Sequence, residues 1–144
     1  MGRYRHTVDA KGRIFLPSKM REEIGASVYV TKSLDPECLS GYTQMQFAEI
    51  RSQLSRLPGT DPVVRDMKRE ILGEAIACDL DGQGRISVTE ELWSQVGIKP
   101  GEEIYIVYLY EKFEIWPAAV YDGRRAVRGT ALSEDLSRYD VKGV

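Results

Sequence analysis

The chain has 144 residues, a net charge of −2, and a composition of 42% hydrophobic and 29% charged residues, which is typical of a globular protein and excludes a disordered one. This length suffices for one ordinary domain or for two very small units that share a core. The longest apolar run, residues 104–110, is too short to span a bilayer, and no apolar stretch follows the N-terminus, so we expect neither a membrane protein nor a secreted one.

Charge is distributed unevenly along the chain. Residues 1–32 contain seven Lys or Arg and three Asp or Glu, whereas residues 74–103 contain two Lys or Arg and seven Asp or Glu. Because phosphate is attracted by positive charge and repelled by negative charge, we expect the first segment to face a nucleic acid and the second segment not to face it.

One segment of the chain occurs twice, at residues 6–17 and at residues 78–89. The two copies share an Asp-x-x-Gly-Arg-Ile pattern at a constant offset of 72 positions, and a glycine recurs further on, at Gly25 and Gly97. The identical residues are Asp9, Gly12, Arg13 and Ile14 in the first copy, and Asp81, Gly84, Arg85 and Ile86 in the second. This register indicates an internal duplication.

Each copy predicts the same order of elements. Asp in the first place and Gly in the fourth favour a tight turn of type I, and apolar residues at alternate positions after it indicate a half-buried strand. A short helix comes next: Pro17 favours its start in the first copy, Thr89 caps it in the second, and a glycine ends it in both. Two further strands close each copy, at residues 27–31 and 38–42 and at residues 104–110 and 113–116. The sequence therefore predicts an α+β fold with two β-β-α-β-β units.

Helices are predicted between the two units and after them. A helix over residues 43–57 begins with the capping-box spacing of Thr43 and Gln46, and a second helix over residues 61–73 begins with Asp followed by Pro. A third helix is predicted to begin at residue 117, and the apolar pattern fades soon after it. The expected organisation is a basic first unit with its trailing helix at residues 3–56, a linking helix at 57–73, an acidic second unit at 74–120 and a loosely ordered tail at 121–144.

With these motifs the chain resembles the MraZ family over residues 3 to 120. Besides the two Asp-x-x-Gly-Arg-Ile motifs, the resemblance rests on residues 6–13, 21–23, 57–62, 72–75 and 113–116. It implies two AbrB-like swapped-hairpin units that form a barrel, and a homo-oligomeric ring. It also implies a transcriptional regulator of the bacterial division and cell-wall gene cluster, which binds short tandem repeats in the promoter region and works in the cytoplasm at the nucleoid. Thr89 departs from the family, which usually has a second Pro there.

The resemblance places contact with double-stranded DNA around the first motif, at Lys11 and Arg13. The other candidate DNA-binding residues are the remaining basic residues of the first segment, Arg3, Arg5, Lys19 and Arg21. Each motif arginine could instead lock its own turn by an ion pair with Asp9 or Asp81, and Lys19 and Arg21 could be solvated surface. Because of the surrounding charge, we expect DNA contact for Arg13 and a structural role, with Asp9, Gly12, Asp81 and Gly84, for Arg85.

Catalytic chemistry is not expected of this chain. His6 is the only histidine, and Cys38 and Cys78 lack the Cys-x-x-Cys spacing of zinc sites, so we expect no catalytic residues, no metal and no cofactor. The sequence contains no phosphate-binding loop that would indicate a small-molecule substrate, and this disfavours a nucleotide-using enzyme. The remaining alternative to a DNA-binding regulator is a ring-forming scaffold that does not bind DNA specifically.

Overall fold

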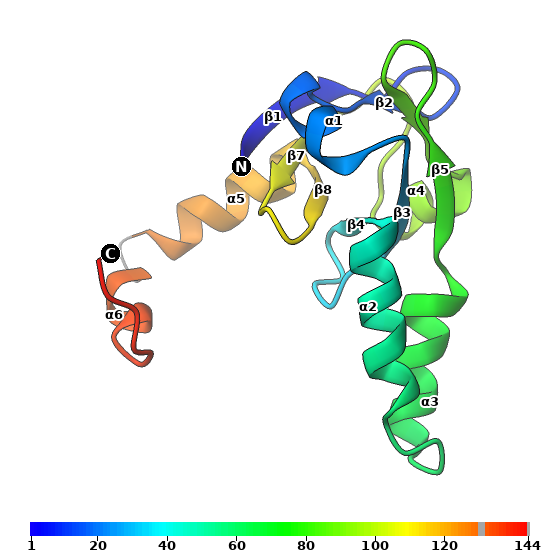
Figure 1. Cartoon of the computed structure of the whole chain (residues 1–144). Helices are drawn as coiled ribbons and strands as arrows, with labels where there is room; N and C mark the ends of the chain where they lie inside the picture. Colours follow the sequence, from blue (N-terminus) through cyan, green and yellow to red (C-terminus); the bar gives the residue numbers. More distant parts are fainter. Residues whose placement is uncertain (130–131, 144) are drawn as a thin grey trace.

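The structure of the chain, a computed structural model, describes residues 1–129 and 132–143 and has an α+β fold (Figure 1). Its elements include two runs with the same order: strand, strand, helix, strand, strand. The first run consists of β1 (Gly2–Thr7), β2 (Arg13–Phe15), α1 (Ser18–Ile24), β3 (Ser27–Lys32) and β4 (Leu39–Thr43). The second run consists of β5 (Ile76–Asp79), β6 (Arg85–Ser87), α4 (Glu90–Gln95), β7 (Glu103–Tyr108) and β8 (Phe113–Pro117).

The strands of the two runs are combined into shared sheets. The large sheet is antiparallel, with the order β1-β7-β8-β4-β3-β5, and β2 pairs with β6 in a separate two-stranded sheet, which we call the ribbon. The first strand of each run lies on the third strand of the other, because β1 pairs with β7 and β5 pairs with β3. Ile14 is opposite Ile86 in the ribbon, so two residues that are equivalent in the sequence motif face each other. The two runs therefore depend on each other for their sheets.

One hydrophobic core serves both runs. Ile14 and Ile86 of the ribbon are each 1% exposed and belong to the same cluster of buried residues as Phe113 and Ile115 of the large sheet. The ring of Phe113 lies directly on the backbone of Gly41, where a Cβ atom would come within 2.0 Å of the ring. Burial of these side chains from both runs stabilises the sheets as one unit.

A helical hairpin connects the two runs and projects away from the ribbon (Figure 1). It contains α2 (Gln44–Ser55), α3 (Pro62–Lys68) and the π-helical turn η1 (Arg69–Gly73). The predicted helix starts are confirmed: Thr43 and Gln46 form a capping box, and Asp61 accepts a hydrogen bond from the backbone N–H of Val63 at 2.9 Å. Among the described residues, no helix has both the length and the apolar character that crossing a membrane requires.

The C-terminal segment is more helical than expected. The helix α5 (Ala118–Arg128) continues through residues 121–128, for which a loosely ordered tail was predicted, and α6 (Leu132–Leu136) follows it. Arg124 holds α5 against the body, because it forms ion pairs with Asp35 and Glu37 and lies over the ring of Trp116, 5.2 Å from its centre. Residues 130, 131 and 144 of the expected tail lie outside the described residues.

Candidate nucleic-acid interface

The two sequence motifs form two turns of the same geometry. In the first turn, the carboxylate of Asp9 accepts hydrogen bonds from the backbone N–H groups of Lys11 and Arg13, both at 2.9 Å, and from Nε of Arg13 at 2.7 Å. The N–H of Gly12 closes the turn on the carbonyl of Asp9 at 3.0 Å. Gly12 has a φ of 76°, which an L side chain rarely adopts, so glycine is required there. The turn is therefore held by its own aspartate.

The second turn repeats these contacts. Asp81 accepts hydrogen bonds from the backbone N–H groups of Gln83 and Arg85, both at 2.9 Å, and from Nε of Arg85 at 2.8 Å. Gly84 has a φ of 77° and closes the turn on Asp81 at 3.0 Å. In both turns these hydrogen bonds, above all that from the backbone N–H of the motif arginine, lower the pKa of the aspartate. Both turns thus present an ionised aspartate bound to an arginine.

The ribbon places the two motif arginines on one face. Arg13 is opposite Ser87, and Arg85 is opposite Phe15, while the residues between them point into the core. Arg13 and Arg85 are therefore diagonal neighbours, whose Cα atoms in an antiparallel pair lie about 7–8 Å apart. The pairing of β2 with β6 therefore places Arg85, for which a structural role was predicted, beside Arg13, for which DNA contact was predicted.

Each of these arginines keeps hydrogen-bond donors available. Nε is bound to the turn aspartate, and within residues 1–129 and 132–143 no acceptor binds the two terminal nitrogens of Arg13 or of Arg85. Their side chains are 27% and 19% exposed. Terminal nitrogens in a planar fork can donate two parallel hydrogen bonds to a guanine edge or to a phosphate. Both arginines thus form the turn-locking ion pair that was the structural alternative, which offsets part of their charge, and both keep terminal nitrogens that can donate to an acceptor.

The other candidate residues lie at different places. Lys11 is exposed at the tip of the first turn, and Lys19 is exposed on α1. Arg3 and Arg5 lie on β1, where the guanidinium of Arg3 is 4.6 Å from the centre of the Tyr105 ring. Arg5 forms an ion pair with Glu103, which raises the pKa of the arginine and offsets its charge. Arg21 is half-buried on α1 beside Gly84 of the second turn. The structure therefore gathers Lys11, Arg13 and Arg21 at the ribbon and its two turns, whereas Arg3 and Arg5 lie on the large sheet.

Two residues that the sequence analysis did not select belong to the same surface. Phe15 is 45% exposed on the ribbon face, with the guanidinium of Arg85 5.7 Å from its ring centre. Gln83 is exposed in the second turn at the position that Lys11 has in the first. Both could have been found, because strand alternation turns Phe15 away from Ile14 and the offset of 72 positions pairs Gln83 with Lys11.

One group of side chains has the composition of a metal site. The ligand atoms of Asp35, Cys38 and Glu114 lie within 4.8 Å of one another. Their charges are already compensated, because Glu114 forms an ion pair with Lys112 at 3.4 Å and Asp35 with Arg124 at 3.5 Å. Burial raises the pKa of the Cys38 thiol to about 11, so the thiol is protonated at neutral pH. A cation would have to displace both basic side chains and a proton.

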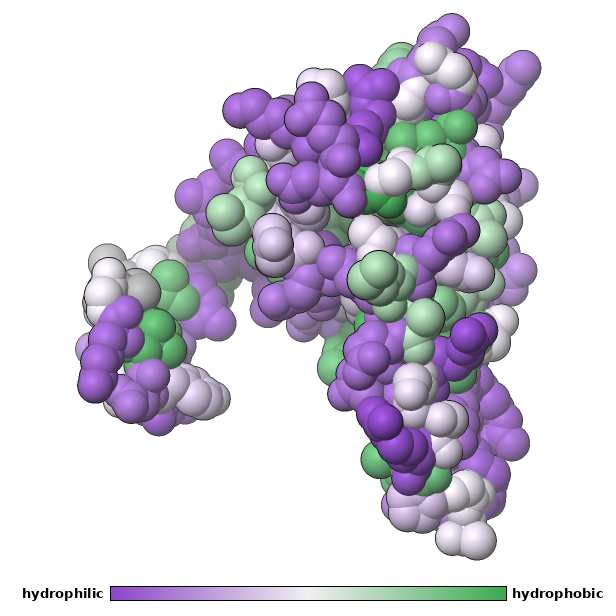
Figure 2. All heavy atoms as spheres, viewed as in Figure 1, coloured by the Kyte–Doolittle hydropathy of each residue, from purple (hydrophilic) through white to green (hydrophobic). Residues whose placement is uncertain are grey.

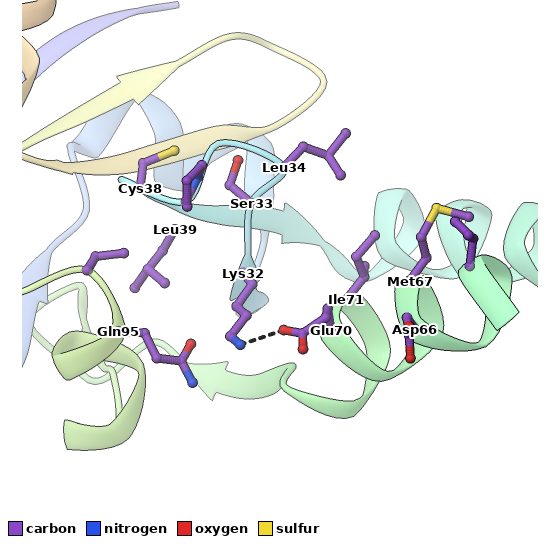
Figure 3. A pocket seen from close by; sticks show the side chains of 13 residues that line it. Lys32, Ser33, Leu34, Cys38, Leu39, Asp66, Met67, Glu70, Ile71 and Gln95 are labelled. Atoms are coloured by element: carbon purple, nitrogen blue, oxygen red, sulfur yellow. Dashed lines mark hydrogen bonds and ion pairs between the residues drawn. The ribbon is translucent and has the colours of Figure 1, made fainter.

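A groove of about 540 Å³ lies between α3, η1, the β3–β4 loop and the end of α4 (Figure 3). Leu34, Met67 and Ile71 contribute apolar side chains to it, and the charges of Lys32 and Glu70 are joined in an ion pair. A surface whose charges are paired attracts phosphate weakly. The groove is therefore distinct in chemistry from the ribbon.

Comparison with known proteins identifies the family. The model of the MraZ protein family, described as antitoxin-like, matches residues 1–70 and again residues 71–125. A protein of Caldicellulosiruptor bescii named transcriptional regulator MraZ is 39% identical over 116 residues, which are 81% of this chain and 79% of that protein. Proteins of the same name from Caldicellulosiruptor saccharolyticus and Acetivibrio thermocellus are 38% and 32% identical, and the alignments cover 100% and 97% of this chain and 99% and 98% of theirs. The chain therefore belongs to the MraZ family.

Proposed function

We propose that the chain is a transcriptional regulator that binds double-stranded DNA through the outer face of the ribbon and its two turns. The observation that carries the proposal is the placement of Arg13 and Arg85 on one face, each with Nε bound to an aspartate and with terminal nitrogens available. The names of the relatives support a role in transcription. No enzymatic activity is proposed.

The shape of the ribbon suits the major groove of DNA. That groove is about 12 Å wide and admits a two-stranded antiparallel ribbon. Arginine side chains on the outer face of such a ribbon reach base edges, where a guanine offers two acceptors to one guanidinium. Lys11, at the end of the ribbon nearest Arg13, is in position to bind the phosphate backbone. Sequence preference is thus assigned to the arginines and general affinity to the lysine.

We also propose that the two runs are copies of one AbrB-like swapped-hairpin unit. The support is the shared element order, the two turns of equal geometry and the double match of the family model. In this proposal residues 3–56 are the first copy with its trailing helix, residues 57–73 link the copies, residues 74–120 are the second copy, and residues 121–144 follow as a tail.

We further propose a ring of identical subunits. Large apolar side chains are exposed on the two projections of the molecule: Val63 is 64% exposed at the helical hairpin, and Val127 and Leu132 are 90% and 60% exposed on the C-terminal helices. Figure 2 shows green areas near the end of the hairpin and on the C-terminal arm, within a largely hydrophilic surface. Exposed apolar areas of this kind mark interfaces. Two different surfaces that join head to tail can close into a ring.

A ring would match tandem binding sites. Adjacent subunits that engage adjacent repeats raise one another's effective concentration, which multiplies weak single contacts. On the basis of the family resemblance, we propose short repeats in the promoter region of the division and cell-wall gene cluster as the target, and the cytoplasm and nucleoid as the location.

The test compares two variants that lose the same charge. Arg13→Ala with Arg85→Ala removes the two ribbon arginines. Arg51→Ala with Arg56→Ala removes two exposed arginines from α2 and its C-cap, and this helix points away from the ribbon. Binding is measured by fluorescence anisotropy on DNA fragments selected from a random pool, from 50 to 200 mM salt. The ribbon variant should lose about 1–3 kcal/mol per lost arginine contact, whereas the α2 variant should keep its affinity.

The same experiment separates the regulator from the scaffold. A DNA-binding ribbon requires that log K of the unmodified protein fall with log salt by about 0.9 for each phosphate engaged. A scaffold requires an assembled protein whose weak affinity for DNA is the same for all fragments. Equal losses in both double variants, or no selected fragments at all, would exclude the ribbon as the DNA-binding surface.

A further inference from the structure

The first turn is contacted by a side chain from the second run. Trp93 lies on α4, is 2% exposed, and donates a hydrogen bond from Nε1 to the carbonyl of Gly12 at 3.0 Å. The same carbonyl accepts a hydrogen bond from the backbone N–H of Val88 at 3.2 Å. The contact is tight, because a Cβ atom at position 12 would lie 3.2 Å from Nε1 of Trp93. The turn that carries Lys11 and Arg13 therefore rests on a residue 81 positions away.

The second turn is contacted in return by a side chain from the first run. Arg21 lies on α1, and a Cβ atom at Gly84 would come within 2.0 Å of a terminal nitrogen of its guanidinium. The carbonyl of Gly84 accepts a hydrogen bond from the backbone N–H of Leu16 at 3.0 Å. Arg21 and Trp93 are separated by the same offset of 72 positions as the two motifs, and each is the fourth residue of its helix. The two helices thus support the turns crosswise.

The surroundings of Arg21 set it apart from a solvated surface arginine. Its Nε atom is buried and has no hydrogen-bond partner among the described residues. A buried donor without an acceptor is unfavourable for stability, so an ordinary stabilising role does not account for the position of this guanidinium. It does bring a positive charge to the turn of the acidic second run.

We propose that Trp93 and Arg21 are positioning residues for DNA binding, each of which orients the turn of the opposite run. Trp93 acts through Gly12 on Lys11 and Arg13, and Arg21 acts through Gly84 on Arg85. Arg21 is thereby reassigned from a phosphate contact to a support for the second turn. This inference rests on the proposed function, because it concerns how the DNA-binding face of the ribbon is held.

Trp93→Phe tests the first half of the proposal, with Trp116→Phe as its matched control. Both tryptophans are buried, and Trp116 also donates from Nε1, to Glu114 at 3.1 Å, but it lies in the large sheet away from the ribbon. Each substitution keeps an aromatic ring and removes one hydrogen bond. Trp93→Phe should weaken DNA binding by the folded protein about three- to tenfold and shift the amide NMR signals of Gly12 and Val88. Trp116→Phe should do neither.

Double variants distinguish positioning from a general loss of stability. In the Arg13→Ala background the effect of Trp93→Phe on DNA affinity should shrink, because its target is gone, and in the Arg85→Ala background it should persist. Arg21→Met should show the opposite pattern. If Trp93→Phe does not fold, Arg21→Met, a substitution at a half-buried position, still tests whether the turn of one run is oriented by a side chain of the other.

Three outcomes would overturn the inference while leaving DNA binding in place. The first is equal affinity loss in the two tryptophan variants, and the second is an affinity after Trp93→Phe that matches the unmodified protein. The third is an Arg21→Met effect of the same size in both alanine backgrounds. Failure of the unmodified protein to bind any DNA would instead contradict the proposed function itself.

Discussion

Exchange of Lys11 and Gln83 tests whether one turn of the ribbon or both turns contact DNA. Both residues occupy the third place of their turns, both side chains are exposed, and both backbone N–H groups donate to the turn aspartate at 2.9 Å. Lys11→Gln and Gln83→Lys therefore change the charge of one turn and keep its hydrogen bonds. Exposed substitutions of this kind change the free energy of unfolding by about 0.5 kcal/mol or less, so the melting temperature should remain constant.

The expected change in DNA affinity follows from the number of phosphates engaged. Loss of one lysine–phosphate contact per subunit should reduce the slope of log K against log salt by about 0.9 for each engaged subunit. Over a fourfold change of salt, this is a factor of about three to four in affinity per contact. Lys11→Gln should therefore bind DNA with lower affinity and a smaller salt slope. Gln83→Lys should bind with higher affinity and a larger salt slope, by similar amounts, because Arg85 lies on the same face as Arg13.

The double exchange decides between one turn and two. If both turns reach DNA, the variant with Lys11→Gln and Gln83→Lys has its positive charge at the other end of the ribbon and should bind with nearly the original affinity and salt slope. Anisotropy titrations of the four proteins on one selected fragment measure this. A double variant as weak as Lys11→Gln alone would refute the reasoning that the ribbon forms one continuous DNA-binding face.

Three further predictions concern stability and assembly. Gly41→Ala should destabilise the fold by about 1–3 kcal/mol in chemical denaturation, because a Cβ atom there would come within 2.0 Å of the Phe113 ring. Gly59→Ala, whose Cβ atom would meet no described residue within 4 Å, should have little effect. Hydrogen bonds from the backbone N–H of Arg13 and then from its side chain lower the pKa of Asp9, so the folded protein binds fewer protons than the unfolded one. The protein should therefore lose stability as the pH falls below about 4. Thermal melts at pH 3 to 6 should show a weaker pH dependence for Asp9→Asn. Sedimentation should give an assembly larger than a monomer, and a purely monomeric species that binds DNA tightly would contradict the ring.

Features that depend on a few neighbouring residues could be predicted from the sequence. The turn at Asp9 and the capping box of Thr43 with Gln46 each close hydrogen bonds within four positions, so their residue types and spacing specify them. The duplication of the motif and the α+β class follow in the same way from pattern and order. The extent of α5 could not be predicted in this way, because contacts with Asp35, Glu37 and Trp116 from other parts of the fold hold that helix.

Only the tertiary structure decided which residues share the candidate site. The sequence separates a basic segment from an acidic one, but the pairing of β2 with β6 brings Arg13 and Arg85, 72 positions apart, onto one face. A different pairing, that of β1 with β7, places Arg3 and Arg5 on the large sheet, where Glu103 binds Arg5. Local hydrogen bonds determine the shape of each turn, whereas burial of one shared core determines which strands meet, and that selection depends on the whole chain at once.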